Sequence, residues 1–374
     1  MFPYNSNEWD PDWTYTVFSD SFDSTSLNTK KWDVVTDFGR GNCVFVDSTG
    51  LTYLVDSSFL HLNMAYSPGY CYDLNGTSHC PDYIAAEIVS KKLFKYGIYE
   101  GRMKFAVEKG SWPAFWFFGG SGASNPMYNK DGYASEIDIA EHNWFKNFIF
   151  RSHHTEHVLH WWWPSKVYGS DQASLGKEGS ARVSADRGEW HTFKLIYTPY
   201  YLRFFVDGNL SWEKSRFYIL NEKGEKINIV AGNLNENPEL YEHEWFPRHE
   251  GNIRLSQQVA GTVNNPVAPQ TSLFDWVTFK SFFEAPTITC PDFIYSGNDC
   301  TPTLNVNPKA QNVTWSLSPA SLFTGKLTGK GKTAEIKAAL SDGKGIITFG
   351  FEMPGGEKFE VEKIIWVSAP APYR

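Results

Sequence analysis

Hydrophobic and polar residues alternate in short runs over about the first 280 residues, and the runs end at Gly, Pro, Asn or Asp. A period of two is typical of β-strands with one buried face, and amphipathic helical patterns are scarce. Asp207-Gly208 follows one such run and predicts a tight hairpin turn. The predicted strands include Phe59–Ala65, Gly97–Ala106, Trp112–Phe118, Glu136–Glu141, Thr192–Tyr197, Leu202–Val206, Ile227–Val230 and Trp276–Phe282. This pattern predicts an all-β fold, a two-sheet β-jelly-roll sandwich.

A domain boundary is predicted near Ala285-Pro286, where the composition of the chain changes. Thirteen of the fifteen tryptophans precede this point, and the chain after it is rich in Thr, Ser, Lys and Gly. Alternating segments then follow at Asn312–Leu317, Ala334–Ala338, Gly345–Phe351 and Phe359–Val367. We therefore expect a large domain over residues 1–285 and a small immunoglobulin-like β-sandwich over residues 286–374. The small domain has no histidine and no carboxylate cluster, so the chemistry is expected in the large one.

Charge and hydropathy exclude two classes of partner. The 374-residue chain has a net charge of −8 and no Lys/Arg cluster, so no nucleic-acid partner is expected. No apolar run reaches the roughly 18 residues of a transmembrane helix, and Met1–Trp13 does not read as a signal peptide.

Cys71 with Cys80, and Cys290 with Cys300, are close enough in sequence to close small loops, which leaves Cys43 over. Local pairs of this kind favour an oxidising compartment.

Three carboxylates lie close together in a segment that otherwise reads as a buried strand. Glu136 and Asp138 are two positions apart, so they share one face of the strand. Glu141 reaches that face only if one residue bulges out near Ile139 or Ala140. The two glutamates would then lie about 13 Å apart along the backbone. Side chains leaning together would close this to about 5–5.5 Å, the separation of the two carboxyl groups in retaining glycoside hydrolysis.

The alternative is a solvated strand face, which is the usual reason for carboxylates on a strand. Two observations count against it. Strands are poor in Asp and Glu, and like charges side by side on one face repel each other. Aromatic residues make up 17% of the chain, more than a core requires, which indicates a surface that stacks flat apolar faces such as sugar rings.

The segment Glu136-Ile-Asp-Ile-Ala-Glu141 resembles the Glu-x-Asp-x-x-Glu signature of glycoside hydrolase family 16, of the β-bulge type. Further segments resemble other motifs of that family in the same order, over roughly residues 12–284. They are Tyr96-Gly-Ile-Tyr-Glu-Gly-Arg-Met-Lys104, Gly110-Ser-Trp-Pro-Ala-Phe-Trp116, Trp190-His-Thr-Phe193 with Arg203-Phe-Phe-Val-Asp-Gly208, and Phe274-Asp-Trp-Val277. The resemblance implies a laminarinase-, agarase- or carrageenase-like jelly roll with a concave cleft.

The resemblance also implies a role for each carboxylate. Glu136 would be the nucleophile, Glu141 the general acid/base, and Asp138 would tune their protonation. Glu141 has to hold a proton near neutral pH, which nearby negative charge favours, whereas Glu136 has to be ionised to attack.

Four residues resemble substrate-binding positions of the family. Trp116 would form the floor of the cleft, with core packing as the alternative, and Glu87 would bind a sugar. His154 is the candidate for a histidine on the strand after the catalytic one, with His153 as its competitor. Trp144 would border the leaving-group side of the cleft.

A structural calcium ion is implied on the convex side of such a fold. Asp275, in Phe-Asp-Trp-Val, matches the usual carboxylate ligand, and Asp20 lies on the early strand that approaches it. No cofactor is expected to be required for catalysis.

The sequence therefore predicts a secreted or cell-surface, monomeric, endo-acting hydrolase of a β-linked polysaccharide. The substrate is left open between galactans, such as agar, porphyran or carrageenan, and β-glucans. Sulfated galactans would require basic subsites, for which Arg151, Lys166 and Arg182 are candidates. The alternatives on the same fold are a non-catalytic polysaccharide-binding protein and a transglycosylase.

Overall fold

The structure is a computed structural model that describes residues 9–74, 76–119, 134–142, 155–163, 174–183, 188–229, 239–243, 245–261 and 263–368. The chain forms two compact units. The larger holds Ser19–Phe279, and the smaller holds the chain from Lys280 onward together with the described N-terminal residues up to Phe18. This division falls a few residues before the predicted boundary at Ala285-Pro286. Within the described parts, no helical segment has the length and hydrophobicity needed to span a bilayer.

The all-β prediction is confirmed, since the described residues contain strands and a single short 3-10 helix, η3 (Ala320–Leu322). One sheet of the larger unit carries the carboxylate segment. Its strands lie in the order β14 (Ser174–Val183), β13 (Thr155–Trp163), β12 (Ala134–His142), β11 (Ser111–Gly119), β21 (Gly251–Val259), β9 (Tyr83–Ser90) and β2 (Trp32–Val34). All neighbours in this order are antiparallel.

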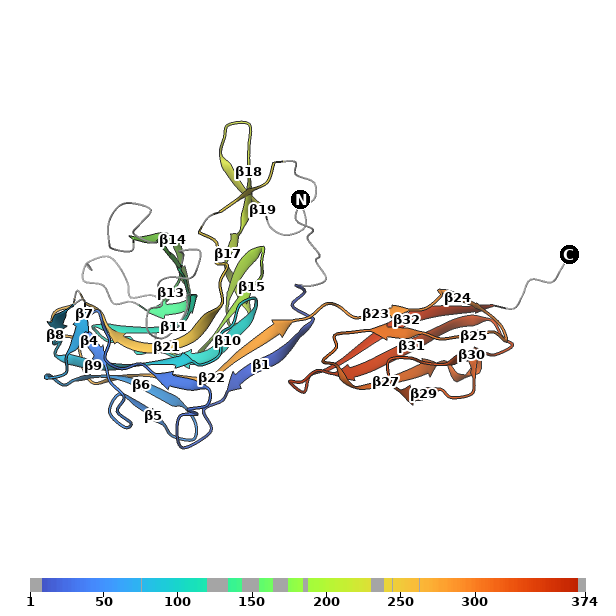
Figure 1. Cartoon of the computed structure of the whole chain (residues 1–374), viewed down its shortest axis with the longest axis horizontal. Helices are drawn as coiled ribbons and strands as arrows, with labels where there is room; N and C mark the ends of the chain where they lie inside the picture. The colour runs from blue at the N-terminus through green and yellow to red at the C-terminus, as the bar shows by residue number, and fades with distance from the viewer. Residues whose placement is uncertain are drawn as a thin grey trace. The chain divides into compact units, whose positions relative to one another are not determined.

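A second sheet packs behind the first. Its strands lie in the order β17 (Asn209–Ser215), β16 (Tyr201–Val206), β15 (His191–Tyr197), β10 (Gly97–Lys104), β22 (Gln270–Phe282), β6 (Leu60–Tyr66) and β5 (Tyr53–Val55), and β1 (Thr14–Asp20) also pairs with β22. Asp207 and Gly208 turn the chain between β16 and β17 with positive φ angles of 49° and 81°, as the predicted hairpin requires. Figure 1 shows β11, β13 and β21 on the inner side of the curved sandwich and β5 and β6 on its outer side.

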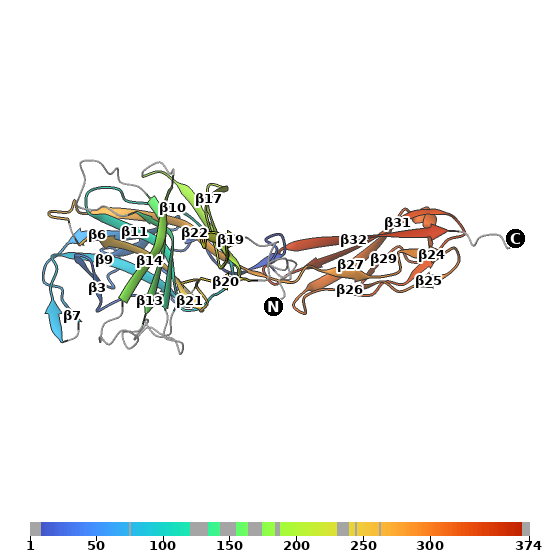
Figure 2. The ribbon, with the colours of Figure 1, turned by 90° about the horizontal axis from the view of Figure 1, so that it is seen from above.

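The hydrophobic core lies between these sheets, because each strand turns one row of side chains inward. Phe115, Phe117 and Ile137 are fully buried on the core side of the first sheet. Tyr99 of β10 meets Phe117 edge to face, with ring centroids 5.7 Å apart. The other side of the first sheet is thereby left for polar groups. Figure 2 shows the strands of this unit from above, with β13 and β14 side by side.

Short strands complete the larger unit, and two of its hairpins bear on the site described below. These hairpins are β3 (Gly39–Arg40) with β4 (Cys43–Phe45), and β7 (Tyr72–Leu74) with β8 (Thr77–His79). The remaining strands are β18 (Phe217–Leu220), β19 (Lys226–Ile229) and β20 (Tyr241–Glu242).

The cysteines follow the predicted local pairing in one of two cases. Cys71 and Cys80 form a disulfide that closes the β7–β8 hairpin. Cys290 and Cys300 are free, with their sulfur atoms 3.4 Å apart. Cys43 is free and buried, and burial raises the pKa of its thiol to about 12.

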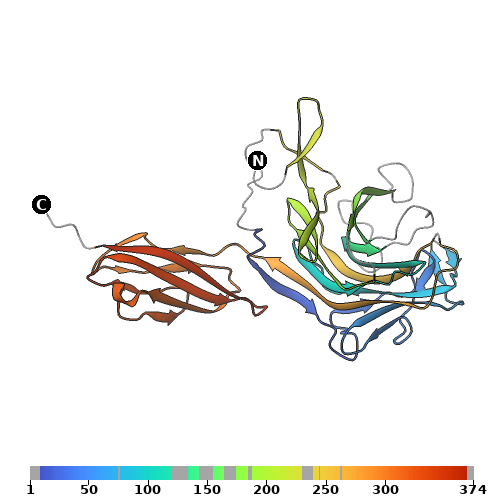
Figure 3. The same ribbon diagram turned by 180° about the vertical axis from the view of Figure 1, so that it is seen from behind.

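The described part of the smaller unit, seen from behind in Figure 3, contains two sheets of three or more strands and a separate pair of strands. The larger of them has the order β24 (Phe293–Tyr295), β32 (Lys358–Ser368), β31 (Gly343–Glu352), β27 (Gln311–Ser318) and β29 (Thr328–Lys330). The other holds β25 (Asp299–Cys300), β30 (Ile336–Ala338) and β28 (Phe323–Thr324), and β23 (Thr287–Thr289) pairs with β26 (Thr303–Asn305). Trp315, Phe349 and Ile365 are among its buried residues. The strands expected in this part of the chain are present, and its immunoglobulin-like character stays a prediction.

Candidate active site

A β-bulge in β12 lies where the sequence pattern requires one. Against β11, Ala140 pairs with Phe115 and Asp138 with Trp116, so Ile139 is an extra residue. Against β13, the register shifts across the same point, between Asp138 and Glu141. The extra residue shifts the alternation of the strand by one position, so Glu136 and Glu141 can share a face despite their odd spacing.

The bulge brings the three carboxylates onto one face of the sheet. Residues directly opposite each other in antiparallel strands share a face. Trp116 lies opposite Asp138, and Ala114 lies opposite Glu141 on the same face of β11. The intervening Ile139 is fully buried on the other side. Asp138 is only 2% exposed, whereas Glu136 and Glu141 are both partly exposed.

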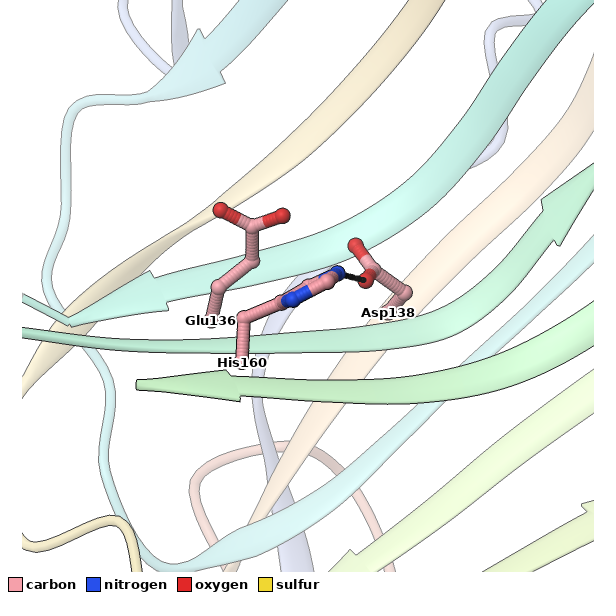
Figure 4. A group of neighbouring side chains, drawn as sticks. All are labelled: Glu136, Asp138 and His160. Carbon is pink, nitrogen blue, oxygen red and sulfur yellow. Dashed lines mark ion pairs between the residues drawn. The ribbon is translucent and has the colours of Figure 1, made fainter. Parts of the chain in front are cut away.

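A histidine on the neighbouring strand joins this group. His160 of β13 lies directly opposite Glu136. Donor atoms of Glu136, Asp138 and His160 all lie within 4.8 Å of one another, and His160 Nε2 is 3.7 Å from Asp138 Oδ2. Figure 4 shows the three side chains on the same side of the sheet, with the imidazole turned toward Asp138. Asp138 therefore forms an ion pair with His160, next to Glu136, when the imidazole is protonated.

The same three groups offer a nitrogen and carboxylate oxygens to a divalent cation. A cation bound there would occupy Glu136, the residue that the sequence predicts to be the nucleophile. The trio therefore fits a proton-handling role better than a metal site.

Glu141 is held by a tryptophan of the neighbouring strand β11. The indole Nε1–H of Trp112 donates a hydrogen bond of 2.5 Å to Glu141 Oε1. An indole is a donor that keeps its proton, so it orients one oxygen and leaves the other for chemistry. Trp112 was predicted as part of a strand and not as a site residue.

His157 fixes the bulge from the core side. Its Nδ1–H donates to the carbonyl oxygen of Ile139 at 2.6 Å, and its ring packs on Phe204 with centroids 4.8 Å apart. Bulged residues lose ladder hydrogen bonds, so this side-chain donor supplies one that the strand cannot. His157 is therefore a positioning residue for the carboxylates.

Because of this histidine, the free energy of unfolding should decrease as the pH is lowered. Burial lowers the pKa of His157 from 6.5 to about 4, against a smaller opposing effect of the Ile139 carbonyl. Between about pH 4 and pH 6.5, the folded state therefore binds fewer protons than the unfolded state. The contribution is present above pH 6.5 and is lost as the pH falls toward 4, and it amounts to about 3 kcal/mol.

Unfolding free energies of the wild type and of His157→Gln, measured at several pH values, test this expectation. The variant should be less stable at pH 7 and should lose less stability than the wild type on acidification. Parallel pH profiles for the two proteins would contradict it.

Trp116 lies on the carboxylate face, as the resemblance implies, but it is not an open floor. Its side chain is 1% exposed, because two guanidinium groups lie against it. Arg40 Cζ is 4.7 Å and Arg254 Cζ is 5.1 Å from the centre of its ring. The indole Nε1–H donates to Ser256 Oγ at 3.2 Å. A sugar can stack on Trp116 only where Arg40 moves aside.

Glu87 has a buried partner in this structure. Its side chain is 1% exposed and forms an ion pair with Arg254, at 2.5 Å between Oε1 and Nη1. Its other oxygen, Oε2, is buried without a hydrogen-bond partner among the described residues. Glu87 therefore holds Arg254 in place, and direct sugar binding by Glu87 stays a prediction.

Some predicted residues lie outside the described parts of the chain. These are His154 and its competitor His153, Trp144, and the basic candidates Arg151 and Lys166. Arg182 is exposed on β14, opposite Glu156 of β13. The histidine that the structure brings to the carboxylates is His160.

The two carboxylates expected to bind calcium both have donors of their own. Asp275 accepts a hydrogen bond of 2.5 Å from Arg102, and Asp20 accepts one of 2.8 Å from the indole of Trp32. Among the described residues, neither of them belongs to a group of three or more His, Cys, Asp or Glu that could hold a metal ion. They fit a calcium site poorly in this arrangement, and calcium binding stays a prediction.

Comparison with known proteins identifies the larger unit. Residues 39–217 match the model of glycosyl hydrolases family 16. This match spans just under half of the chain and lies within the larger unit. The chain is also similar to the laminarinase from Rhodothermus marinus in its solved structure, with a TM-score of 0.50 and 21% identity, over 72% of this chain and 98% of that one. At this identity, the likeness shows that the family 16 fold is shared.

Two curated relatives carry more specific names. A Beta-glucanase of Acetivibrio thermocellus is 26% identical over 245 residues, which is 65% of this chain and 59% of the relative. A Keratan-sulfate endo-1,4-beta-galactosidase of Sphingobacterium multivorum is 26% identical over 130 residues, 34% of this chain and 27% of the relative. The chain thus spans about 59% of the length of the first of them.

Proposed function

We propose that this chain is an endo-acting, retaining glycoside hydrolase that cleaves internal β-linkages of a polysaccharide. One observation carries the proposal. The bulge at Ile139 puts Glu136 and Glu141 on one face of a sheet, next to partly open space and with separate hydrogen-bonding surroundings. Paired carboxyl groups on one face are what double displacement at an anomeric carbon requires.

In the first step, the Glu136 carboxylate attacks the anomeric carbon and forms a glycosyl ester. The carbon–oxygen bond to the leaving sugar breaks, and Glu141 gives its proton to the departing oxygen. In the second step, Glu141 takes a proton from water, the water oxygen attacks the same carbon, and the ester to Glu136 breaks. Two inversions give net retention.

The neighbours of the two glutamates support this division of roles. His160 and Asp138 lie beside Glu136 and can take up or release a proton as its charge changes. Trp112 orients Glu141 through its indole. None of these steps calls for a cofactor.

Product stereochemistry tests the mechanism. We expect proton NMR of a fresh digest to show the β-anomer first and the α-anomer only later, by mutarotation. Size analysis should show oligosaccharides of several lengths early in the reaction, as an endo-acting enzyme gives. An α-anomer as the initial product would contradict the retaining assignment, and monosaccharide release alone would contradict endo action.

Two backbones are candidate substrates. The Beta-glucanase relative favours a β-glucan such as laminarin. The covered Trp116 and the keratan-sulfate galactosidase relative favour a β-linked galactan backbone instead. A panel of laminarin, mixed-linkage glucan, agarose, porphyran, carrageenan and keratan sulfate separates them.

We also propose that the protein acts outside the cell, as a monomer, with the smaller unit as an accessory module. The local disulfide Cys71–Cys80 supports an oxidising compartment. A non-catalytic binding protein and a transglycosylase are the alternatives. Binding without turnover would indicate the first, and longer products at high acceptor concentration would indicate the second.

A further inference from the structure

Arg40 is carried to the carboxylate face by a hairpin that is fixed against the end of β21. Asn42 N donates to the carbonyl oxygen of Val259 at 2.9 Å. Gly41 has a positive φ of 63°, and a Cβ at this position would lie 2.2 Å from the same carbonyl oxygen. Only glycine allows this approach, so the place of Arg40 is set by the backbone beside it.

The guanidinium group of Arg40 lies between two aromatic rings. Its Cζ is 4.7 Å from the centre of the Trp116 ring and 5.8 Å from that of Phe38. Trp116 is buried, whereas Phe38 is 40% exposed. Arg40 is therefore stacked on a fixed surface on one side and reaches partly open space on the other.

Arg40 has no charged partner among the residues that the structure describes, where neither an ion pair nor a side-chain hydrogen bond involves its guanidinium. Arg254, which also lies against the Trp116 ring, is neutralised by Glu87. A stacked, partly buried guanidinium with free N–H groups is a pre-arranged binder of planar or tetrahedral anions.

The position of Arg40 matters because of the charges near it. Trp116 lies directly opposite Asp138, so the ring on which Arg40 stacks belongs to the strand next to the one that carries the carboxylates. An anionic sugar entering there would be repelled by the carboxylates of Glu136 and Asp138. A cation at this point offsets that repulsion for the unit beside the cleaved bond.

An aromatic edge continues from Arg40 away from the carboxylates. The ring centroid of Tyr72 is 6.4 Å from that of Phe38. On β8, the ring of His79 stacks on Tyr72, with centroids 5.3 Å apart. Tyr72 also covers Gly39, where a Cβ would lie 2.0 Å from its ring. The disulfide-closed β7–β8 hairpin thus extends the surface on which sugar rings would lie, with Arg40 at its inner end.

We propose that Arg40 recognises an anionic substituent, either a sulfate ester or a carboxylate, on the glycan unit that binds beside Trp116. The inference rests on the proposed function for the site and names the substrate class, an anionic β-linked glycan. Arg40 is then the residue that sets the preference for the charged chain over the neutral one.

Binding to a disabled enzyme tests this inference independently of turnover. Glu136→Gln would be titrated calorimetrically with keratan sulfate oligosaccharides and with the same oligosaccharides after chemical desulfation. A carboxylated arm uses sialylated and desialylated lactosamine oligosaccharides. We expect at least one anionic form to bind about tenfold or more tightly than its neutral counterpart.

Adding Arg40→Met to Glu136→Gln should raise the Kd of the preferred anionic form by about 10- to 100-fold and remove most of the preference. Arg40→Lys, which keeps the charge without the planar fork, should fall in between. The matched control is Arg203→Met, which removes an arginine that stacks on Tyr201 in the other sheet. It should keep the preference.

Equal affinity for charged and neutral forms, or an equal loss for both on Arg40→Met, would overturn the inference, and so would the absence of binding to either. Hydrolysis by the wild type is read separately. A protein that binds anionic glycans through Arg40 but cleaves none would overturn the proposed function and leave this inference standing.

Discussion

Replacing Glu136 by Gln should lower kcat by about 10⁴-fold or more on the best substrate of the panel. The amide has nearly the same shape but cannot attack the anomeric carbon, so no glycosyl ester forms. Glu136 is partly exposed, and the melting temperature should therefore change little. Steady-state kinetics and thermal unfolding of the purified variant check both statements.

Two further variants separate the roles of the glutamates. For Glu136→Ala, added azide should restore turnover and give the glycosyl azide of inverted configuration, because a small anion can take the place of the missing carboxylate. Glu141→Gln should slow substrates with poor leaving groups most, since it removes the proton donor. Glu213→Gln on β17, which loses an ion pair with Arg203, is the matched control and should keep full activity. Wild-type rates for Glu136→Gln would overturn the assignment.

Breaking the ion pair between Glu87 and Arg254 should destabilise the larger unit by about 3–5 kcal/mol. Either Glu87→Ala or Arg254→Ala leaves the other charge buried without its partner. The double variant Glu87→Gln with Arg254→Met should cost less than the sum, because neither charge remains. Guanidinium unfolding followed by tryptophan fluorescence measures these free energies, since most tryptophans lie in this unit.

The pair Arg203–Glu213 provides the comparison. Its side chains are 33% and 27% exposed, and breaking it should cost about 1 kcal/mol or less. If removing Glu87 cost no more than this, the ion pair would not be what holds Arg254 against Trp116. Activity of Glu87→Gln on neutral and charged substrates would then show whether Glu87 contacts sugar directly.

Features that depend only on residues close together in the sequence could be predicted from local patterns. The hairpin at Asp207-Gly208 is present because two residues with positive φ suit that turn. The bulge was predicted from the odd spacing of Glu136 and Glu141 and the expectation that both share one face, because a strand has a period of two.

Contacts between distant segments could not be predicted in the same way. Arg40 covers Trp116, and Arg254 pairs with Glu87, across long stretches of chain whose register no local pattern shows. His160 had a weak signal, since Glu156, Val158 and His160 alternate on one strand. Choosing His160 over His154 required the register of β13 against β12, which depends on the connection between them.

Because of the bulge at Ile139, the shared face of Glu136 and Glu141 depends on the number of residues between them and not on which residues these are. Exchanging the side chain of Ile139 or Ala140 leaves that count unchanged, whereas deleting one of them moves Glu141 to the core face. A library of point substitutions would therefore overlook the feature. A scan of single-residue deletions and insertions along β12 would locate it, and would show how closely chain length and activity are linked in this strand.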